Sequence, residues 1–415
     1  MDRLRIAGTV RTLRVRASLF FHIRCLVGFP WFWPSQPLAD QAMVQARRIV
    51  RQHYARGHHP IHRGLARVLV TAVWPLAALV SIWEIRRSRG PVAVPVKEAP
   101  RAFWAAIRHN VLPGEYYAYA LWHPNRGANI DNYLYAKEGI RLFGLLNKPT
   151  QPNPIDDKLA FHELCKVHAL PTPEVLAAFA PTAKLLEFRS DRPAPHDLFV
   201  KPRFGQGGDG VERFRWQGRI FQSNRGGRLT PEDLGEYLAT RARTENRALL
   251  VQPALSNHPS LGVDADGALA TARLVTGISL GGDVAPLFAY IYFGHPNQIV
   301  AHGRVALIDI ASGRLMSAPQ DFPSGKRSNV DIDSNQPCTL PDWETLLRHI
   351  KVAHRACSNF IFIGWDVAFT EHGPMLLEGN ANWCADVYQS LRGEPLGHTK
   401  FAGILAERLR DLGIS

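Results

Sequence analysis

The chain has 415 residues, of which 46% are hydrophobic and 20% are charged. This composition is typical of a globular protein with a large core and excludes an intrinsically disordered chain. The formal net charge of +13 is uneven, because residues 1–110 hold 18 Lys and Arg against 4 Asp and Glu, whereas residues 111–415 hold 31 against 32. A basic segment therefore precedes a nearly neutral body. Because that segment has no RNP-like, zinc-finger or basic-zipper pattern, we expect no nucleic-acid partner.

The five cysteines are far apart in the sequence and form no CxxC pair. This spacing favours neither a disulfide framework nor a zinc site and is typical of a reducing compartment. No small-residue cleavage site follows the apolar run near Leu19, so we expect no secretory signal. The sequence thus predicts a cytoplasmic protein.

An uncharged run, VLVTAVWPLAALVSIW at residues 68–83, lies inside the basic segment. A helix of this length reaches about 24 Å, less than the roughly 30 Å of a bilayer's hydrocarbon core, and Pro75 is expected to kink it. Three interpretations remain open. In one, residues 1–90 hold a helix at the inner face of an anionic cell membrane, with flanking arginines and with Trp74 and Trp83 at the interface. In the second, the run is a helix buried against the body. The third is a single-pass membrane span.

Two local patterns follow the basic segment. Residues 91–100, PVAVPVKEAP, predict an extended, proline-rich connector. Further on, DKLAFHELCKVHAL at residues 157–170 predicts a helix with Asp156 or Asp157 as its N-cap. Lys158 lies beside this cap.

A glycine-rich turn, PRFGQGGDG at residues 202–210, lies between predicted strands at 198–201 and 211–214. Its spacing matches GxGxxG, but a strand rather than a helix follows, which excludes a Rossmann site. A P-loop is excluded as well, because Lys201 precedes the glycines. The turn is either an ordinary hairpin or a flap whose backbone N–H groups cover a polyphosphate while Lys201 reaches a phosphate oxygen.

Two further strands are predicted in the second half of the chain. LLVQP at residues 249–253 predicts a strand that ends at its proline, and TARLVT at 271–276 alternates as a half-buried strand does. Arg273 in the second strand faces either a charged site or solvent.

A hairpin near the C-terminus carries two carboxylates. Residues 366–370 and 374–378 predict two strands, and the loop EHG at 371–373 is a favoured three-residue connection. Such a loop places Asp366 directly opposite Glu378, with Cβ atoms about 5 Å apart.

An amide completes this cluster of oxygen atoms. Asn380 lies two residues beyond Glu378 and therefore on the same face of the strand. Carboxylates this close repel each other unless a cation joins them, and hard oxygen ligands suit Mg²⁺ or Mn²⁺. The alternative is an exposed acidic hairpin without a ligand.

The order of these elements resembles the ATP-grasp superfamily, and it is most similar to the sugar-transfer-associated group of that superfamily. The resemblance covers roughly residues 130–415 and rests on DK at 157–158, FVKP at 199–202, the glycines at 205–210, LLVQP at 249–253, TARLVT at 271–276, YFGHPNQIVAHGRVALIDIASG at 292–313 and GWDVAF…LLEGN at 364–380. It implies an α/β (α+β) fold in which two α+β subdomains clamp ATP, preceded by a helical basic extension. The implied parts are the extension at 1–100, a pre-ATP-grasp linking region at 101–155, a subdomain with the lysine and the flap at 156–255, and a subdomain with the arginine strand and the metal hairpin at 256–415.

The resemblance also implies roles for individual residues. Those that would bind ATP are Lys158, Lys201, Gly205, Gly207, Gly208, Val251, Gln252 and Arg273. Among them, Lys201 and Arg273 are the candidates for direct participation in catalysis, whereas the backbone of Val251 and Gln252 would bind adenine. The residues that would hold one or two Mg²⁺ (or Mn²⁺) ions are Asp366, Glu378 and Asn380. Many relatives have a ribose-binding Glu near Gln252, so the ribose contact is an open question.

The implied activity is that of an ATP- and Mg²⁺-dependent ligase in polysaccharide or cell-surface glycan metabolism. It would join a small-molecule or glycan-linked carboxylate to an amine (or a thiol) through an acyl phosphate. Two alternatives are a phosphotransferase with a hydroxyl acceptor and a non-catalytic, membrane-tethered nucleotide-binding protein. Candidates for the acceptor pocket are His258, His295, Asn297 and His302.

Overall fold

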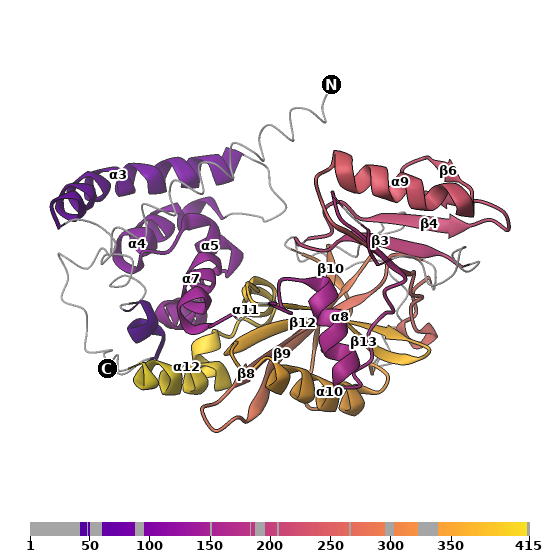
Figure 1. Ribbon diagram of the computed structural model, residues 1–415. Coiled ribbons are helices and arrows are strands. Elements are labelled where there is room, and N and C mark those ends of the chain that lie inside the picture. Colours follow the sequence, from indigo (N-terminus) through magenta and orange to yellow (C-terminus); the bar gives the residue numbers. More distant parts are fainter. Residues whose placement is uncertain are drawn as a thin grey trace. The chain divides into compact units, whose positions relative to one another are not determined.

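The computed structural model (Figure 1) describes residues 42–47, 49, 60–87, 95–149, 152–182, 184–186, 196–205, 207–264, 267–294, 303–322 and 339–412. These residues belong to two compact units. The described residues of the first unit lie between 42 and 146 and between 384 and 412, and those of the second lie between 147 and 383.

The first unit is helical. Its elements are α3 (Pro60–Arg87), η1 (Val96–Glu98), α4 (Ala99–His109), α5 (Pro113–Ala118), α6 (Pro124–Gly127), η2 (Ile130–Asn132), α7 (Ala136–Leu146), α11 (Asp386–Arg392), η4 (Leu396–His398) and α12 (Lys400–Asp411). The Gln389 side chain of α11 joins distant parts of this unit, because it donates to the carbonyl oxygen of Leu134 at 2.8 Å and accepts from the Leu134 amide at 2.9 Å.

The uncharged run of the basic segment forms part of α3, which has 28 residues and contains Pro75. The helix is longer than the run because it continues into the flanking arginines. The prediction of an extended connector over 91–100 is wrong for its second half, since η1 begins at Val96 and α4 at Ala99. Pro100 lies in the first turn of α4, where a missing N–H costs no helical hydrogen bond. None of the described helices combines the length and the apolarity that a membrane crossing requires.

The second unit contains two antiparallel sheets. The order of strands is β2-β1-β7-β3-β4-β5-β6 in the first sheet and β11-β10-β9-β8-β12-β13 in the second. Their bounds are β1 (Ala177–Phe179), β2 (Lys184–Leu186), β3 (Leu198–Pro202), β4 (Glu212–Trp216), β5 (Phe221–Ser223), β6 (Arg228–Leu229), β7 (Leu249–Pro253), β8 (Thr271–Ile278), β9 (Val284–Phe293), β10 (Arg304–Ile308), β11 (Gln320–Asp321), β12 (Phe362–Thr370) and β13 (Gly373–Asn380). The predicted α+β class and the predicted strands at 198–201, 249–253 and 271–276 are confirmed.

Helices cover both sheets. Leu234 and Leu238 of α9 (Pro231–Thr244) are buried against the first sheet. The helices α8 (Lys158–Val167) and α10 (Trp343–Ala356) lie against the second sheet (Figure 1). Phe161 of α8 and Ile350 of α10 are buried in one apolar core with residues of that sheet. The short η3 (Pro259–Leu261) precedes β8. At the start of α8, Lys158 contacts both the loop after β3 of the first sheet and Glu378 of β13 in the second sheet.

Candidate functional site

Asp157 fixes the start of α8 beside the end of β3. It is the N-cap of α8, as the sequence predicts, and its carboxylate accepts from the amides of Leu159 at 3.0 Å and Ala160 at 3.4 Å. The Arg203 guanidinium binds the same carboxylate with two hydrogen bonds, of which the Nε bond is 2.7 Å. This contact joins the start of α8 to the flap at Arg203, two residues before Gly205.

Lys158 connects the flap to the carboxylate hairpin. Its Nζ donates to the carbonyl oxygen of Gly205 at 2.6 Å and lies 3.2 Å from the Glu378 carboxylate. Only 14% of the Lys158 side chain is exposed. A cation held in this position faces both the glycine backbone and the acidic strand.

The hairpin brings the two carboxylates together by a different register from the expected one. Thr370 pairs with Gly373, so the connecting loop has two residues rather than three, and that prediction is wrong. Gly373 has a φ of +92° and already belongs to the returning strand. A β-bulge beside Asp366, in which Leu377 is the extra residue, then restores the predicted pairing of Asp366 with Glu378.

Arg273 faces this pair rather than solvent. On the neighbouring strand β8 it pairs with Asp366, and its guanidinium binds the Asp366 carboxylate through Nε and, at 3.0 Å, through Nη2. The Nδ2 of Asn380 lies 3.4 Å from an oxygen of Asp366 and 3.4 Å from an oxygen of Glu378. Two carboxylates and one amide converge, as the sequence predicts.

The charges of the site act strongly on one another. Burial lowers the pKa of Lys201 to about 8, and the charge of Lys158 acts in the same direction against that of Glu378. Burial alone would raise the pKa of Glu378, but Lys158 and Lys201 outweigh it and hold this pKa below its ordinary value. Burial raises the pKa of Asp366 to about 6, against the opposing charge of Arg273. Such perturbed groups are typical of binding and catalytic sites.

The donor set fits Mg²⁺. Asp366, Glu378 and Asn380 offer two carboxylates and one amide. Within the part of the chain that the structure describes, no group of three His, Cys, Asp or Glu side chains could hold a metal ion. Mg²⁺ commonly takes only one or two protein carboxylates and completes its shell with water and phosphate oxygens. A half-turn of the Asn380 amide would exchange its nitrogen for its oxygen.

A cavity of about 380 Å³ opens at this cluster. Its lining includes Asp156, Lys158, Phe204, Gly205, Glu378, Asn380 and Asn382. The volume lies within the range of small-ligand sites. Phe204, Asn382 and Asp156 were not predicted as site residues, because nothing in the local sequence distinguishes them from ordinary loop residues.

The flap glycines adopt backbone conformations that side chains disfavour. The φ angles of Gly205, Gly207 and Gly208 are +107°, +75° and +72°, which only glycine adopts without strain. A Cβ atom added at Gly205 or Gly207 would meet open space. These glycines are therefore required by the turn itself, and they leave room beside it.

The two predicted hinge residues lie apart from the cavity lining. The carbonyl oxygen of Val251 accepts from the amide of Leu176 at 2.8 Å, and the Gln252 side chain donates to the carbonyl oxygen of Pro173 at 3.1 Å. Both residues belong to β7, between β1 and β3. Their role in adenine binding stays a prediction.

Of the acceptor-pocket candidates, His258 lies in the described part of the chain, and it is not among the residues that line the cavity. His258 caps η3, where its Nδ1 accepts from the Ser260 amide at 3.1 Å. His295, Asn297 and His302 lie outside the described residues.

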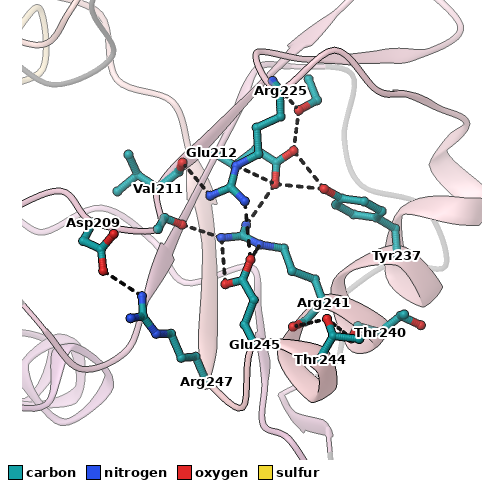
Figure 2. A network of polar contacts seen from close by, with 12 residues as sticks. Asp209, Val211, Glu212, Arg225, Tyr237, Thr240, Arg241, Thr244, Glu245 and Arg247 are labelled. Carbon is teal, nitrogen blue, oxygen red and sulfur yellow. Dashed lines mark hydrogen bonds and ion pairs between the residues drawn. The ribbon is translucent and has the colours of Figure 1, made fainter. Parts of the chain in front are cut away.

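A buried ionic network lies directly after the flap and was not predicted (Figure 2). Glu212, the first residue of β4, is fully buried, and Arg241 of α9 donates to its carboxylate at 2.9 Å. Arg241 also donates to the carbonyl oxygen of Gly210, and Arg225 donates to that of Val211 at 3.3 Å. The network therefore holds the last residues of the flap to α9.

The network extends to both sides of this contact. Tyr237 donates to Glu212 at 3.1 Å, Arg241 binds Glu245 at 2.9 Å, and Arg247 binds Asp209 of the flap at 2.9 Å (Figure 2). Tyr237, Arg241 and Arg247 bind acidic partners 25 to 38 positions away, and pairs so far apart leave no local pattern. The local signals are an acidic residue at an inward position of β4 and the spacing of Arg241 and Glu245, which is that of an i,i+4 pair on a helix.

Comparisons with known proteins identify the family. The family model for sugar-transfer associated ATP-grasp matches residues 138–401, more than half of the chain. No curated protein matches this sequence. Solved structures that are similar include D-alanine–D-alanine ligase from Bacillus anthracis with ATP, at 12% identity, a TM-score of 0.39, and coverage of 67% of this chain and 78% of that chain.

Two further structures are similar. L-amino acid ligase from Bacillus licheniformis is 13% identical at a TM-score of 0.37, covering 70% of this chain and 60% of that one. The biotin carboxylase domain of Hydrogenobacter thermophilus 2-oxoglutarate carboxylase, with MgADP and bicarbonate, is 13% identical at a TM-score of 0.34, covering 62% and 45%. All three likenesses are distant, whereas the family model matches the segment that contains both sheets and the site. The chain belongs to the sugar-transfer associated ATP-grasp family.

Proposed function

We propose that the protein is an ATP- and Mg²⁺-dependent ligase that joins a carboxylate to an amine (or a thiol) through an acyl phosphate. One observation carries the proposal: Lys158 binds both the flap and the Glu378 carboxylate at the edge of the cavity. Cations beside a glycine flap suit a polyphosphate, and the acidic strand opposite suits its metal ion.

The reaction needs two displacements. A carboxylate oxygen of the first substrate attacks the γ-phosphorus of ATP, the bond from that phosphorus to the β–γ bridging oxygen breaks, and ADP leaves with the electron pair. The amine nitrogen then attacks the acyl carbon, the bond from carbon to the phosphate oxygen breaks, and phosphate leaves while the amine loses a proton. Neither step needs a covalent protein nucleophile, but both need stabilised phosphate charge and exclusion of water.

The residues of this chain would share that work. Lys158 and Lys201 would bind phosphate oxygens, with Gly205, Gly207 and Gly208 as the flap. Arg273 would stabilise the transferred phosphoryl group. Asp366, Glu378 and Asn380 would hold Mg²⁺, which when bound neutralises phosphate charge. Val251 and Gln252 are proposed for the adenine end.

The division of labour between the sheets supports the proposed parts of the chain. The strands of the first sheet lie within 177–253 and those of the second within 271–380. This supports a division near residue 255 between the proposed ATP-grasp subdomains 156–255 and 256–415, whereas residues 384–412 group with the helical unit, as do the described residues of the proposed basic extension 1–100 and most of the proposed linking region 101–155.

The name of the family supports one proposed class of substrates. A family named for sugar transfer supports a small-molecule or glycan-linked carboxylate and an amine acceptor in polysaccharide or cell-surface glycan metabolism. Mg-ATP with mixtures of carboxylates and amines should release ADP and phosphate together and yield an amide. A phosphate ester on one substrate, without free phosphate, would instead identify a phosphotransferase.

Replacing Lys158 tests the nucleotide site without a known acceptor. We expect Lys158→Ala to weaken Mg-ATP binding about 10- to 100-fold, because charge-assisted hydrogen bonds contribute roughly 1.5–3 kcal/mol. Lys166→Ala is the matched control, since Lys166 lies on the same helix with 51% of its side chain exposed. Calorimetric titration measures both. Equal affinities for the two variants would exclude Lys158 from the nucleotide site.

The affinity for ATP should also depend on pH through Lys201. Its pKa of about 8 in the ligand-free protein would rise beside phosphates, so binding takes up a proton above pH 8. Affinity should therefore be flat between about pH 7 and pH 8, above the titration of Asp366 and of the terminal phosphate, and fall by up to about tenfold for each pH unit above pH 8. Lys201→Arg keeps its charge and should remove this dependence. A flat profile for the wild type would contradict the proposed contact.

A further inference from the structure

The helix α3 has one face packed inside the first unit. Trp74, Ala78 and Ile82 are buried, and the Trp74 Nε1 donates to the carbonyl oxygen of Ala106 at 3.0 Å. Figure 1 shows α3 lying along α4 and α5, and Ile82 packs in one apolar cluster with Tyr116 of α5. This face belongs to the core of the unit.

The opposite face of α3 is apolar and exposed. Its residues, with their exposed fractions, are Val73 (38%), Leu76 (63%), Leu79 (51%), Val80 (46%) and Trp83 (57%). At 3.6 residues per turn they lie on one arc of the helix, opposite the buried residues. Single exposed apolar side chains are ordinary in proteins, but a continuous stripe of five is typical of a docking surface.

The charges around this face are positive. Arg86 and Arg87 are exposed at the C-terminal end of the stripe, and the Arg87 guanidinium lies 5.0 Å from the centre of the Trp83 ring. The acidic residue of α3, Glu84, is partly buried and borders the stripe one turn after Val80, where the two exposed arginines outnumber it. Residues 1–110 carry a net charge of +14. A partner with a negatively charged surface above an apolar layer would therefore be complementary to this face of α3.

We propose that this exposed face of α3 binds the surface of an anionic lipid bilayer. The five apolar side chains enter the headgroup and acyl boundary, Trp83 lies at that boundary, and Arg86 and Arg87 bind lipid phosphates. The buried face of α3 remains on α4 and α5, so the helix lies in the membrane plane.

Two other partners for this face of α3 are a second copy of the chain and residues 1–41 of the same chain, and their charge argues against both. A second copy of the chain would bring the same basic segment to the face, and like charges oppose that contact. Residues 1–41, which lie outside the described part, hold six Arg and two Asp, so they too are cationic. An anionic bilayer attracts each of these groups.

Vesicle binding by the full-length protein tests the proposal. The probes are vesicles of phosphatidylcholine alone and of phosphatidylcholine with phosphatidylglycerol, and the measurement is co-sedimentation. We expect binding to the anionic vesicles only, and weaker binding as salt rises from about 0.1 M to about 1 M, because the screening length shortens from about 10 Å to about 3 Å.

Two double variants test whether the exposed face of α3 is the part that binds the vesicles. Leu76→Glu with Leu79→Glu places two charges on the stripe and should reduce partitioning at least about tenfold. Val167→Glu with Val352→Glu adds the same charge at exposed apolar positions of the second unit and should reduce it far less. Neither pair removes a buried side chain.

Four outcomes would overturn the proposal. The first is that the wild type does not bind anionic vesicles at low salt, and the second is that both double variants lose vesicle binding equally. The third is a dimer of the wild type that becomes a monomer in the Leu76/Leu79 variant, and the fourth is a fall in unfolding temperature confined to that variant. The third would identify a subunit interface, and the fourth a face covered by the chain itself.

Discussion

Glu378→Gln should reduce turnover at least about 10²-fold while leaving the protein folded. Glu378 lies opposite Asp366 and 3.2 Å from the Lys158 ammonium. The change keeps the shape of the side chain but removes the charge that Lys158 and Lys201 stabilise. Loss of one such preorganised electrostatic group commonly costs 10²- to 10³-fold in rate, by the order of magnitude known for oxyanion-site donors. ADP release at saturating ATP measures the effect.

The dependence on magnesium should change as well. With one carboxylate fewer, the variant should need a higher Mg²⁺ concentration for half-maximal activity, because ligand charge contributes to the affinity for the ion. Glu371→Gln is the matched control, since Glu371 lies exposed in the loop of the same hairpin and should behave as the wild type does. If Glu378→Gln and Glu371→Gln released ADP at the same rate, the proposed metal site would be wrong.

The parts of the site that the sequence predicts depend on local signals. Asp157 is an N-cap because of its place before an apolar helical pattern. The pairing of Asp366 with Glu378 follows from alternation and a tight turn. The predicted pairing is right, but the predicted three-residue loop is wrong. The shorter loop and the bulge at Leu377 each shift the register by one residue in opposite directions, so the two shifts cancel. A register prediction from loop length alone is therefore fragile.

What the sequence leaves open depends on contacts between distant segments. Arg273 alternates with apolar residues, so it could face either side of its strand, and only the pairing of β8 with β12 brings it to Asp366. The length of α3 could not be predicted from its uncharged run, because arginine is a good helix former and the helix continues into the flanking arginines. The network of Glu212 is the extreme case, since Arg225 comes from the turn after β5, and Tyr237 and Arg241 come from α9.

Arg241→Met should destabilise the second unit by about 3–5 kcal/mol. Glu212 is fully buried and Arg241 has only 5% of its side chain exposed, so the substitution leaves a buried carboxylate without its main counter-charge, which costs this much in other proteins. The carbonyl oxygen of Gly210 loses a donor at the same time. Denaturant unfolding measures the stability, and ATP affinity should fall too because residues 209–212 end the flap.

Two controls separate the ion pair from the general effect of shortening an arginine. Arg243→Met removes a guanidinium from the same helix, but Arg243 is 58% exposed in its pair with Glu236, so the expected change is at most about 0.5 kcal/mol. Arg241→Met combined with Glu212→Gln removes both charges and should cost less than Arg241→Met alone, because no buried charge is left unpaired. An equal loss in the single and the double variant would mean that the Arg241 stem, not its charge, holds the flap to α9.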